Sequence, residues 1–306
     1  MNPYRSILFV PGHKLEWVHK AMIGQADALV LDLEDAVPPA AKVEARALVR
    51  SGLEAAAGSG KGLMVRVNAL STGLAAGDLA AITCDALDAI VIPKVEAPED
   101  VLAYATLLDY FETANGVTAG RVEILIIAET ALGILRAYEL CKASSRVTSI
   151  FGGTARDGDV SRSLGYTWTR EGLETLYIRS KVLLDARAAG VRYPISGTWT
   201  DLQDLEGLTA FARQSREIGY TGMFVIHPTH VEVVNRVFTP TPAEIAYYQS
   251  VLESMEKAQA ADLGAIALEG TMVDIAMVEK ARQFLEFAQQ IGALSQPPGG
   301  SRGAAQ

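Results

Sequence analysis

Cysteine is scarce in this chain of 306 residues, which has only Cys84 and Cys141 and no Cys-x-x-Cys pair. Two distant cysteines cannot build a disulfide framework or a zinc knuckle. Lysine and arginine (27) are outnumbered by aspartate and glutamate (36), so the net charge is −9. A general nucleic-acid-binding surface, which depends on neutralising phosphates, is therefore not expected. A local cluster of arginines could still bind an anionic substrate.

Long apolar runs are also absent. The first run, residues 7–10, is too short for the core of a signal sequence or for a membrane span, and no small-residue cleavage site follows it. We therefore expect no membrane association and a cytoplasmic location. The first run is not followed by a Gly-x-Gly-x-x-Gly motif either, which argues against a dinucleotide-binding fold.

Eight short apolar runs alternate with amphipathic stretches. The runs are residues 6–12, 27–35, 63–68, 88–94, 122–130, 147–153, 193–199 and 222–228. Their middles are continuously apolar, as expected of strands that are covered on both faces. Helical patterns between them include residues 40–56, 98–114, 169–190 and 204–219. Eight such units predict a (β/α)8 TIM barrel, which we assign to residues 1–238.

The pattern after Pro228 is helical throughout. Residues 242–264 and 273–292 predict two further helices, joined by residues 265–272. Because a barrel does not need them, we interpret residues 239–294 as a C-terminal helical appendage or lid. Residues 295–306 lack large apolar side chains, and we expect this tail to be disordered.

Polar side chains gather where the predicted strands end, which is where (β/α)8 enzymes carry their active sites. These residues are Asp32, Glu34, Asp35, Arg66, Asn68, Lys94, Glu129, Asp157, Asp159 and His227. A single charge at a strand end is usually a solvated loop residue or a helix cap. Charges after six of the eight predicted strands indicate a site instead.

Glu129 follows a buried-looking run directly, where a carboxylate without a positive partner is costly to desolvate. Glu129 and Asp159 end adjacent strands, so their carboxylates can converge. Two such carboxylates repel each other unless a cation lies between them, and oxygen ligands without His or Cys suit Mg²⁺. The alternative is a salt bridge between Glu129 and Arg66. Lys94 is a second alternative centre, since a strand-end lysine beside other cations can form a Schiff base.

Several motifs carry a resemblance to a known family. In chain order they are RSILFVPG, ADALVLDLEDAVPPAAK, VRVN, IPKVEAPEDV, AETALGIL, DGDVSRSLG, LYIRSKVLLDARAAG, IHPTHVEVVNRVFTPTPAEI and LEGTMVDIAMVEKA. Together they resemble the citrate lyase β-subunit-like enzymes of the HpcH/HpaI aldolase/citrate lyase superfamily, the group that holds malyl-CoA and citramalyl-CoA lyases. The resemblance covers roughly residues 5–290.

This resemblance implies a lyase that depends on Mg²⁺, with Mn²⁺ as an alternative ion. The reaction would cleave or form a C–C bond in a short β-hydroxyacyl-CoA, such as citramalyl-CoA or malyl-CoA. The products would be acetyl-CoA and an α-keto acid, pyruvate or glyoxylate. Two alternatives exist among such enzymes: a citrate lyase β-subunit that acts on citryl-acyl carrier protein, and a malyl-CoA thioesterase or malate synthase-like activity.

The resemblance also implies the metal ligands. The family's metal glutamate falls on Glu129, and its metal aspartate falls on Asp159, which keeps the family's spacing to a following Leu-Gly pair. The chain departs from the family pattern at residues 154–158, where a longer loop adds Asp157. Asp157 is therefore a rival to Asp159 as a metal ligand.

The remaining site residues follow in the same way. Arg66 matches the family's arginine on the third strand, and we expect it to bind the substrate together with Asn68 and Glu129. Glu34 and Asp35 match an acidic pair that orients groups around the site.

A late aspartate completes the predicted catalytic set. Asp274 ends a Gly-Thr-Met-Val-Asp motif, and in relatives that act on free CoA thioesters this aspartate reaches the active site of a neighbouring subunit. We expect Asp274 to serve as the acid–base group there. A homotrimer, or a multiple of it, with a small-molecule acyl-CoA as substrate follows from the resemblance.

Overall fold

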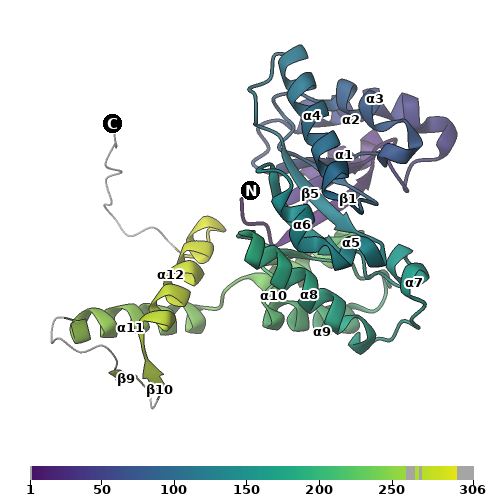
Figure 1. Ribbon diagram of the computed structural model, residues 1–306. Helices are drawn as coiled ribbons and strands as arrows, with labels where there is room; N and C mark the ends of the chain where they lie inside the picture. Colours follow the sequence, from purple (N-terminus) through teal and green to yellow (C-terminus); the bar gives the residue numbers. More distant parts are fainter. Residues whose placement is uncertain (1, 260–265, 269–270, 295–306) are drawn as a thin grey trace. The chain divides into compact units, whose positions relative to one another are not determined.

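The computed structural model describes residues 2–259, 266–268 and 271–294 (Figure 1). The chain divides into two compact units, Met1–Phe238 and Thr239–Gln306. The predicted disordered tail, residues 295–306, lies outside the described residues.

Eight parallel strands form the sheet of the first unit, in the order β6-β5-β4-β3-β2-β1-β8-β7. The two strands at the ends of this order, β6 and β7, are in contact, so the sheet is a nearly closed barrel. The strands are β1 (Ser6–Pro11), β2 (Ala28–Asp32), β3 (Gly62–Arg66), β4 (Ala89–Ile92), β5 (Glu123–Ala128), β6 (Val147–Gly152), β7 (Ile195–Ser196) and β8 (Gly222–Val225). The predicted (β/α)8 barrel is confirmed.

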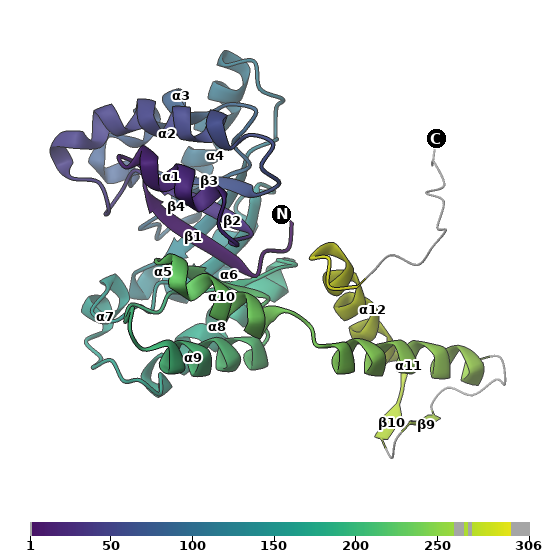
Figure 2. The ribbon, with the colours of Figure 1, turned by 180° about the vertical axis from the view of Figure 1, so that it is seen from behind.

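Helices connect the strands and lie on the outside of the sheet, as the front and back views show (Figures 1 and 2). They are α1 (Leu15–Met22), α2 (Lys42–Ala56), α3 (Ala75–Ile82), α4 (Pro98–Ala114), α5 (Ala131–Leu135), α6 (Ala137–Lys142), α7 (Asp159–Leu164), α8 (Leu173–Ala189), α9 (Leu205–Ile218) and α10 (Pro228–Phe238). Two short 3₁₀ helices, η1 (Pro39–Ala41) and η2 (Leu70–Thr72), precede α2 and α3.

The apolar strand runs are explained by burial on both faces. On β2, Ala28 and Val30 belong to a cluster built almost entirely from strand residues, which is the inside of the barrel. Leu29 and Leu31, which alternate with them, pack with the helices. Successive side chains of a strand point to opposite faces, so both series must be apolar here.

The ends of helix α9 show how local sequence sets element boundaries. The side chain of Asp204 accepts a hydrogen bond from the Gly207 backbone N–H and caps the first turn. Gly219 ends the helix with φ +118°, a conformation that favours glycine. The helix predicted from residues 204–219 is therefore observed with its caps.

The second unit contains α11 (Pro242–Gln259), β9 (Ile266–Leu268), β10 (Thr271–Val273) and α12 (Ile275–Gln290). The rings of Tyr248 and Phe284 join α11 and α12, with centroids 4.3 Å apart. The prediction of helices alone in this part was wrong, since β9 and β10 pair antiparallel. Their β-branched residues favour strands, and only two residues, 269–270, separate them, the spacing typical of a hairpin.

No helix in the described part of the chain is long and apolar enough to cross a membrane.

Candidate active site

The strand register brings polar side chains to one level at the carboxyl end of the barrel. Asp32, the last residue of β2, pairs in register with Arg66, the last residue of β3. Arg66 continues the inward-facing series of Met64, and Glu129 continues that of Ile127. These three polar side chains therefore cap the barrel interior at the end where (β/α)8 enzymes act.

Arg66 is the centre of a charge cluster at the β2–β3 side of this end. Its Nε and Nη2 donate to the two oxygens of Asp32 at 2.8 and 2.6 Å. Its Nη1 lies 3.0 Å from Glu34 Oε2 and 3.3 Å from Asp35 Oδ2. Burial alone would lower the pKa of Arg66, but these carboxylates outweigh it and raise the pKa. Arg66 is therefore permanently charged, and the carboxylates of Asp32, Glu34 and Asp35 hold its guanidinium group in place.

Lys94 extends the cluster towards the next strands. Its Nζ donates to Glu34 Oε1 at 2.5 Å and lies 3.4 Å from Asp35 and 3.9 Å from Asp159. Burial opposes the charge, but the bond to Glu34 and the nearby carboxylates outweigh it and raise the pKa of Lys94. A Schiff-base lysine must lose its proton to attack a carbonyl. The observed setting disfavours the Schiff-base alternative for Lys94.

The two carboxyls of the acidic pair differ. Burial raises the pKa of Glu34, with Arg66 and Lys94 opposing it. For Asp35, the attraction of Arg66 and Lys94 and a bond with Glu34 outweigh burial, so its pKa is lowered. Asp35 is thus the more acidic member of the pair, and its side chain is more than half exposed.

Glu129 is placed quite differently from these carboxylates. It is 7% exposed, and its Oε2 is a buried atom without a hydrogen-bond partner. Burial, together with the charges of Glu34 and Asp159, raises the pKa of Glu129 to about 8 against the pull of Arg66 and Lys94. Among the described ion pairs, Arg66 joins the β2 carboxylates and not Glu129. The salt-bridge alternative for Glu129 is therefore not what the structure contains.

A cavity of about 300 Å³ lies at this end of the barrel, and several of these groups line it. Its polar lining comes from Asp32, Asp35, Arg66, Glu129, Asp159 and Thr198, and its apolar lining includes Phe9, Ile127, Phe151 and Ile226. Gly153 keeps the floor open beside Glu129, because a Cβ at this glycine would lie 3.2 Å from Glu129 Cγ.

The donor set fits a hard divalent cation. An unpaired, desolvated carboxylate oxygen on Glu129 and a second carboxylate on Asp159 face the same cavity. Mg²⁺ takes one or two protein carboxylates and completes its shell with water and substrate oxygens. The described residues contain no group of three or more His, Cys, Asp or Glu side chains arranged for a metal, so a cage made by protein alone is not what this site offers.

The structure separates the two candidate aspartates. Asp159 is the first residue of α7, its side chain is 23% exposed, and it lines the cavity. Asp157 is 82% exposed, lies 3.5 Å from Arg156, and adopts φ 55°. The inserted loop therefore turns Asp157 to the surface and brings Asp159 to the cavity.

Asn68 is held by structural contacts. Its Nδ2 donates to Asp78 at 2.7 Å, and its Oδ1 accepts from Lys42 Nζ at 2.7 Å. Both partners lie on the helices that flank its loop, α3 and α2. Its backbone N–H also donates to Asp78. These contacts order the loop after β3, and we leave Asn68 out of the proposed substrate contacts.

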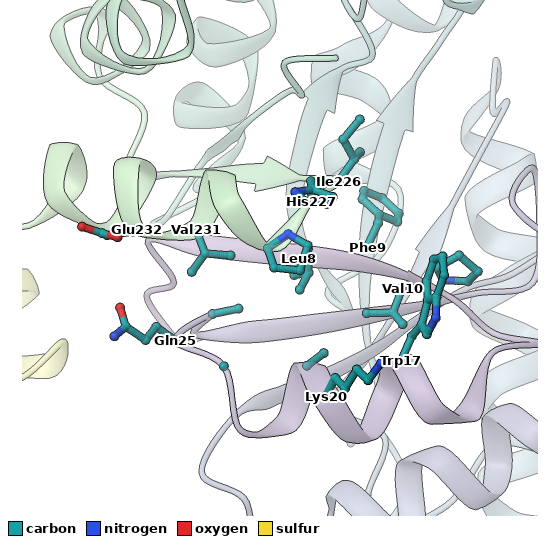
Figure 3. A pocket seen from close by; sticks show the side chains of 15 residues that line it. Leu8, Phe9, Val10, Trp17, Lys20, Gln25, Ile226, His227, Val231 and Glu232 are labelled. Carbon is teal, nitrogen blue, oxygen red and sulfur yellow. The ribbon is translucent and has the colours of Figure 1, made fainter. Parts of the chain in front are cut away.

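A second, larger cavity of about 610 Å³ adjoins the first (Figure 3). Trp17 and Lys20 come from α1 on one side, and Val231 of α10 and His227, which directly precedes α10, lie on the other. Phe9, Pro11 and Ile226 line both cavities. No sequence motif alone pointed to this space, although Phe9 could have been assigned an inward position from the alternation of β1.

Asp274 belongs to the second unit and is the N-cap of α12. Its Oδ1 accepts hydrogen bonds from the backbone N–H groups of Ala276 and Met277. The capping role explains an aspartate here without chemistry, so its predicted acid–base role stays a prediction.

Comparison with known proteins gives the family. Residues 5–228 match the HpcH/HpaI aldolase/citrate lyase family. A (3S)-malyl-CoA thioesterase of Cereibacter sphaeroides is 34% identical over 293 residues, which is 96% of this chain and 97% of the relative. The citrate lyase subunit beta of Escherichia coli K12 is 33% identical over 288 residues, 94% of each chain.

Solved structures agree. The protein CitE of Mycobacterium tuberculosis, in complex with magnesium, acetoacetate and coenzyme A, superposes with a TM-score of 0.70 at 27% identity and covers 94% of this chain and 98% of its own. A citrate lyase from Burkholderia xenovorans LB400 has a TM-score of 0.81 at 20% identity, covering 96% of this chain and 94% of its own; this likeness concerns the fold alone. The motifs, the barrel and these matches agree that the chain belongs to the HpcH/HpaI aldolase/citrate lyase family.

Proposed function

We propose that this protein is a Mg²⁺-dependent lyase that cleaves or forms a C–C bond in a short β-hydroxyacyl-CoA, such as citramalyl-CoA or malyl-CoA. The observation that carries the proposal is the buried Glu129 carboxylate, whose Oε2 lacks a partner in a cavity shared with Asp159. The family match and the magnesium and coenzyme A in the CitE structure support it. Mn²⁺ is expected to substitute for Mg²⁺.

Glu129 and Asp159 would hold the ion. When bound, Mg²⁺ supplies a Lewis acid that orients the carboxylate and hydroxyl oxygens of the substrate and makes the hydroxyl more acidic. Glu129 must give up its proton to bind the ion, because metal ligands are used deprotonated. Gly153 leaves the room that this arrangement needs beside Glu129.

Arg66, Glu34 and Asp35 would set the charge on the β2–β3 side of the site. Arg66 lines the cavity and is already clamped by Asp32, so it offers a fixed positive charge to a keto-acid carboxylate or an enolate oxygen. Such preorganised charge in a partly desolvated site stabilises charge that develops during the reaction. Lys94 holds Glu34, while Asp35 reaches the cavity in its ionised form.

The second cavity suits the pantetheine arm of the substrate. Its walls include Leu8, Val10 and Val231, and it shares Phe9 with the cavity at the reacting centre. Apolar walls with a few placed polar groups are the usual lining of a ligand site. Lys20 adds one positive charge for a phosphate, and Trp17 adds an aromatic face.

Asp274 would protonate the carbon that leaves as acetyl-CoA, and it would do so across a subunit boundary in a homotrimer. Asp274→Asn is the suitable variant, because asparagine also caps helices well. Its activity should fall by about 10²–10⁴-fold. If Glu129→Ala and Asp274→Asn chains are co-expressed in equal amounts and mix at random, about a quarter of all sites should pair two intact residues and recover activity. Inactive mixed rings would show that Asp274 does not act in trans.

A thioesterase is the second candidate, favoured by the 34% identical (3S)-malyl-CoA thioesterase. One experiment tests both activities: a panel of malyl-CoA, citramalyl-CoA and citryl thioesters is incubated with Mg²⁺, and α-keto acid and free thiol are both followed. Keto acid without free thiol supports the lyase. Free thiol without keto acid would replace it with a thioesterase. Activity restricted to an acyl-carrier-protein thioester would replace it with a citrate lyase β-subunit.

A further inference from the structure

The loop that carries Asp159 connects β6 to α8 over residues 153–172. Its first arm contains Arg156, three residues before Asp159, and its second arm contains Trp168. The Arg156 guanidinium carbon lies 5.3 Å from the centroid of the Trp168 ring. A cation over an indole face is an attractive contact, so the two arms are joined to each other by side chains.

The second arm is in turn fixed to the barrel. The Trp168 ring lies 5.2 Å from the ring of Trp199, which is 2% exposed and follows β7. Trp199 packs at 5.7 Å against Phe211 of α9, and the buried Arg179 of α8 lies 4.7 Å from the same phenylalanine ring. A ladder of three aromatic rings with a cation at each end therefore runs from the loop into the core between α8 and α9.

Ion pairs hold the same arm from a second direction. Arg170 donates to both oxygens of Asp204 at 2.8 Å, and Asp204 is the N-cap of α9. Arg179 also donates to the carbonyl of Gly172 at 3.0 Å, at the end of the loop. The second arm is thus fixed to the barrel. The contact between Arg156 and Trp168 in turn fixes the first arm, which precedes Asp159.

We propose that Arg156 and Trp168 are positioning residues for the metal site: they hold the Asp159 loop in the arrangement that presents the carboxylate to the cavity. The inference rests on the proposed function, since it takes Asp159 as a Mg²⁺ ligand. Val160, which is fully buried, fixes the backbone of α7. The ladder fixes the segment that precedes α7, residues 154–158, which carries both Arg156 and the outward-turned Asp157.

The structure also provides the reporter. The chain has three tryptophans, and two of them, Trp168 and Trp199, are the contacting pair of the ladder. In a Trp17→Phe background, tryptophan fluorescence reports this pair alone. Addition of Mg²⁺ to the metal-free protein should change the emission, and the change measures metal affinity without any substrate or turnover.

The test compares Mg²⁺ dissociation constants from this fluorescence titration and from calorimetry. Arg156→Gln should weaken Mg²⁺ binding by about two- to fivefold, the equilibrium equivalent of one exposed cation–aromatic contact. Trp168→Ala, which loses two contacts, should weaken it by about five- to tenfold, and Arg156→Lys should restore part of the affinity. If Trp168→Ala fails to fold, Trp168→Leu read by calorimetry takes its place.

Arg192→Gln is the matched control, because Arg192 lies 5.4 Å from the Tyr193 ring in a similar contact outside the loop. It should bind Mg²⁺ like the wild type. Wild-type affinity in Arg156→Gln, or equal weakening in Arg192→Gln, would overturn the positioning role and leave the proposed function standing. A wild-type protein that binds no Mg²⁺ would overturn both.

Discussion

The two sides of the barrel rim differ in how their charges are paired. On the β2–β4 side, Asp32 and Glu34 are buried, and both are bound by Arg66, with Lys94 on the far oxygen of Glu34. On the β5–β6 side, Glu129 is equally buried but keeps an oxygen without a partner. Glu34 and Glu129 thus lie at similar depth but differ in their partners: a cation lies against each oxygen of Glu34, whereas none of the described ion pairs involves Glu129.

The carboxylates on the β2–β4 side already have cationic partners within the protein, whereas Glu129 on the β5–β6 side has an oxygen that could bind a ligand. A buried ion pair with good geometry is self-sufficient, and breaking it is costly because one charge stays behind. A buried carboxylate without a partner instead shifts its pKa and marks a functional site. The β2–β4 side therefore serves as a fixed electrostatic wall, and the β5–β6 side is where a cation would bind.

The largest expected effect comes from breaking the paired side. Arg66→Met should destabilise the protein by about 3–5 kcal/mol in urea unfolding, because it leaves Asp32 and Glu34 buried without their main partner. Arg236→Met is the control, since its pair with Glu232 is long (4.0 Å) and exposed, and it should cost less than about 1 kcal/mol. Similar losses in the two variants would contradict the view of Arg66 as the centre of the cluster.

The next prediction concerns the choice of metal ligand on the β5–β6 side. Asp159→Asn should weaken Mg²⁺ binding by about 100-fold or more, since even the outer partners of metal ligands are worth about 10–100-fold. Asp157→Asn, a matched change two residues away on an exposed side chain, should stay within about twofold of the wild type. Calorimetric titration with Mg²⁺ measures both. A larger loss in Asp157→Asn would assign the ligand to the inserted loop.

A third prediction concerns stability against pH in EDTA. The folded pKa of Glu129 is about 8, above its ordinary value of 4.5. The folded state therefore holds a proton that the unfolded chain releases, so stability should fall as pH rises from about 4.5 to 8. Thermal unfolding of the wild type should show this fall relative to Glu129→Gln, which cannot titrate. Parallel profiles for the two proteins would mean that Glu129 is not desolvated.

The sequence predicted the barrel because its signals are local and repeated. Eight apolar runs, with glycines such as Gly219 at helix ends, are visible without knowing any tertiary contact. The alternation of β5 also places Glu129 inside once Leu125 and Ile127 are taken as core. The family motifs then assigned the remaining polar residues.

Other features could not be read from the chain because they depend on distant partners. Asn68 follows β3 like a site residue, but Asp78 and Lys42 hold its amide. Lys94 gains its role from Glu34, 60 residues away in sequence. The β9–β10 hairpin was missed because three-residue strands are shorter than any pattern that distinguishes them from a linker.

The central claim is that Glu129 is a protonated, unpaired carboxyl that becomes a Mg²⁺ ligand. Calorimetric Mg²⁺ titrations in buffers of different ionisation enthalpy measure the protons released on binding. With a pKa of about 8, the Glu129 carboxyl is protonated in about ten molecules for every one in which it is ionised at pH 7. The wild type should therefore release about 0.9 proton per Mg²⁺ ion at pH 7 and about 0.1 at pH 9. Glu129→Gln should bind weakly and release none. Tight binding by Glu129→Gln, or proton release by the wild type that does not change with pH, would contradict the account.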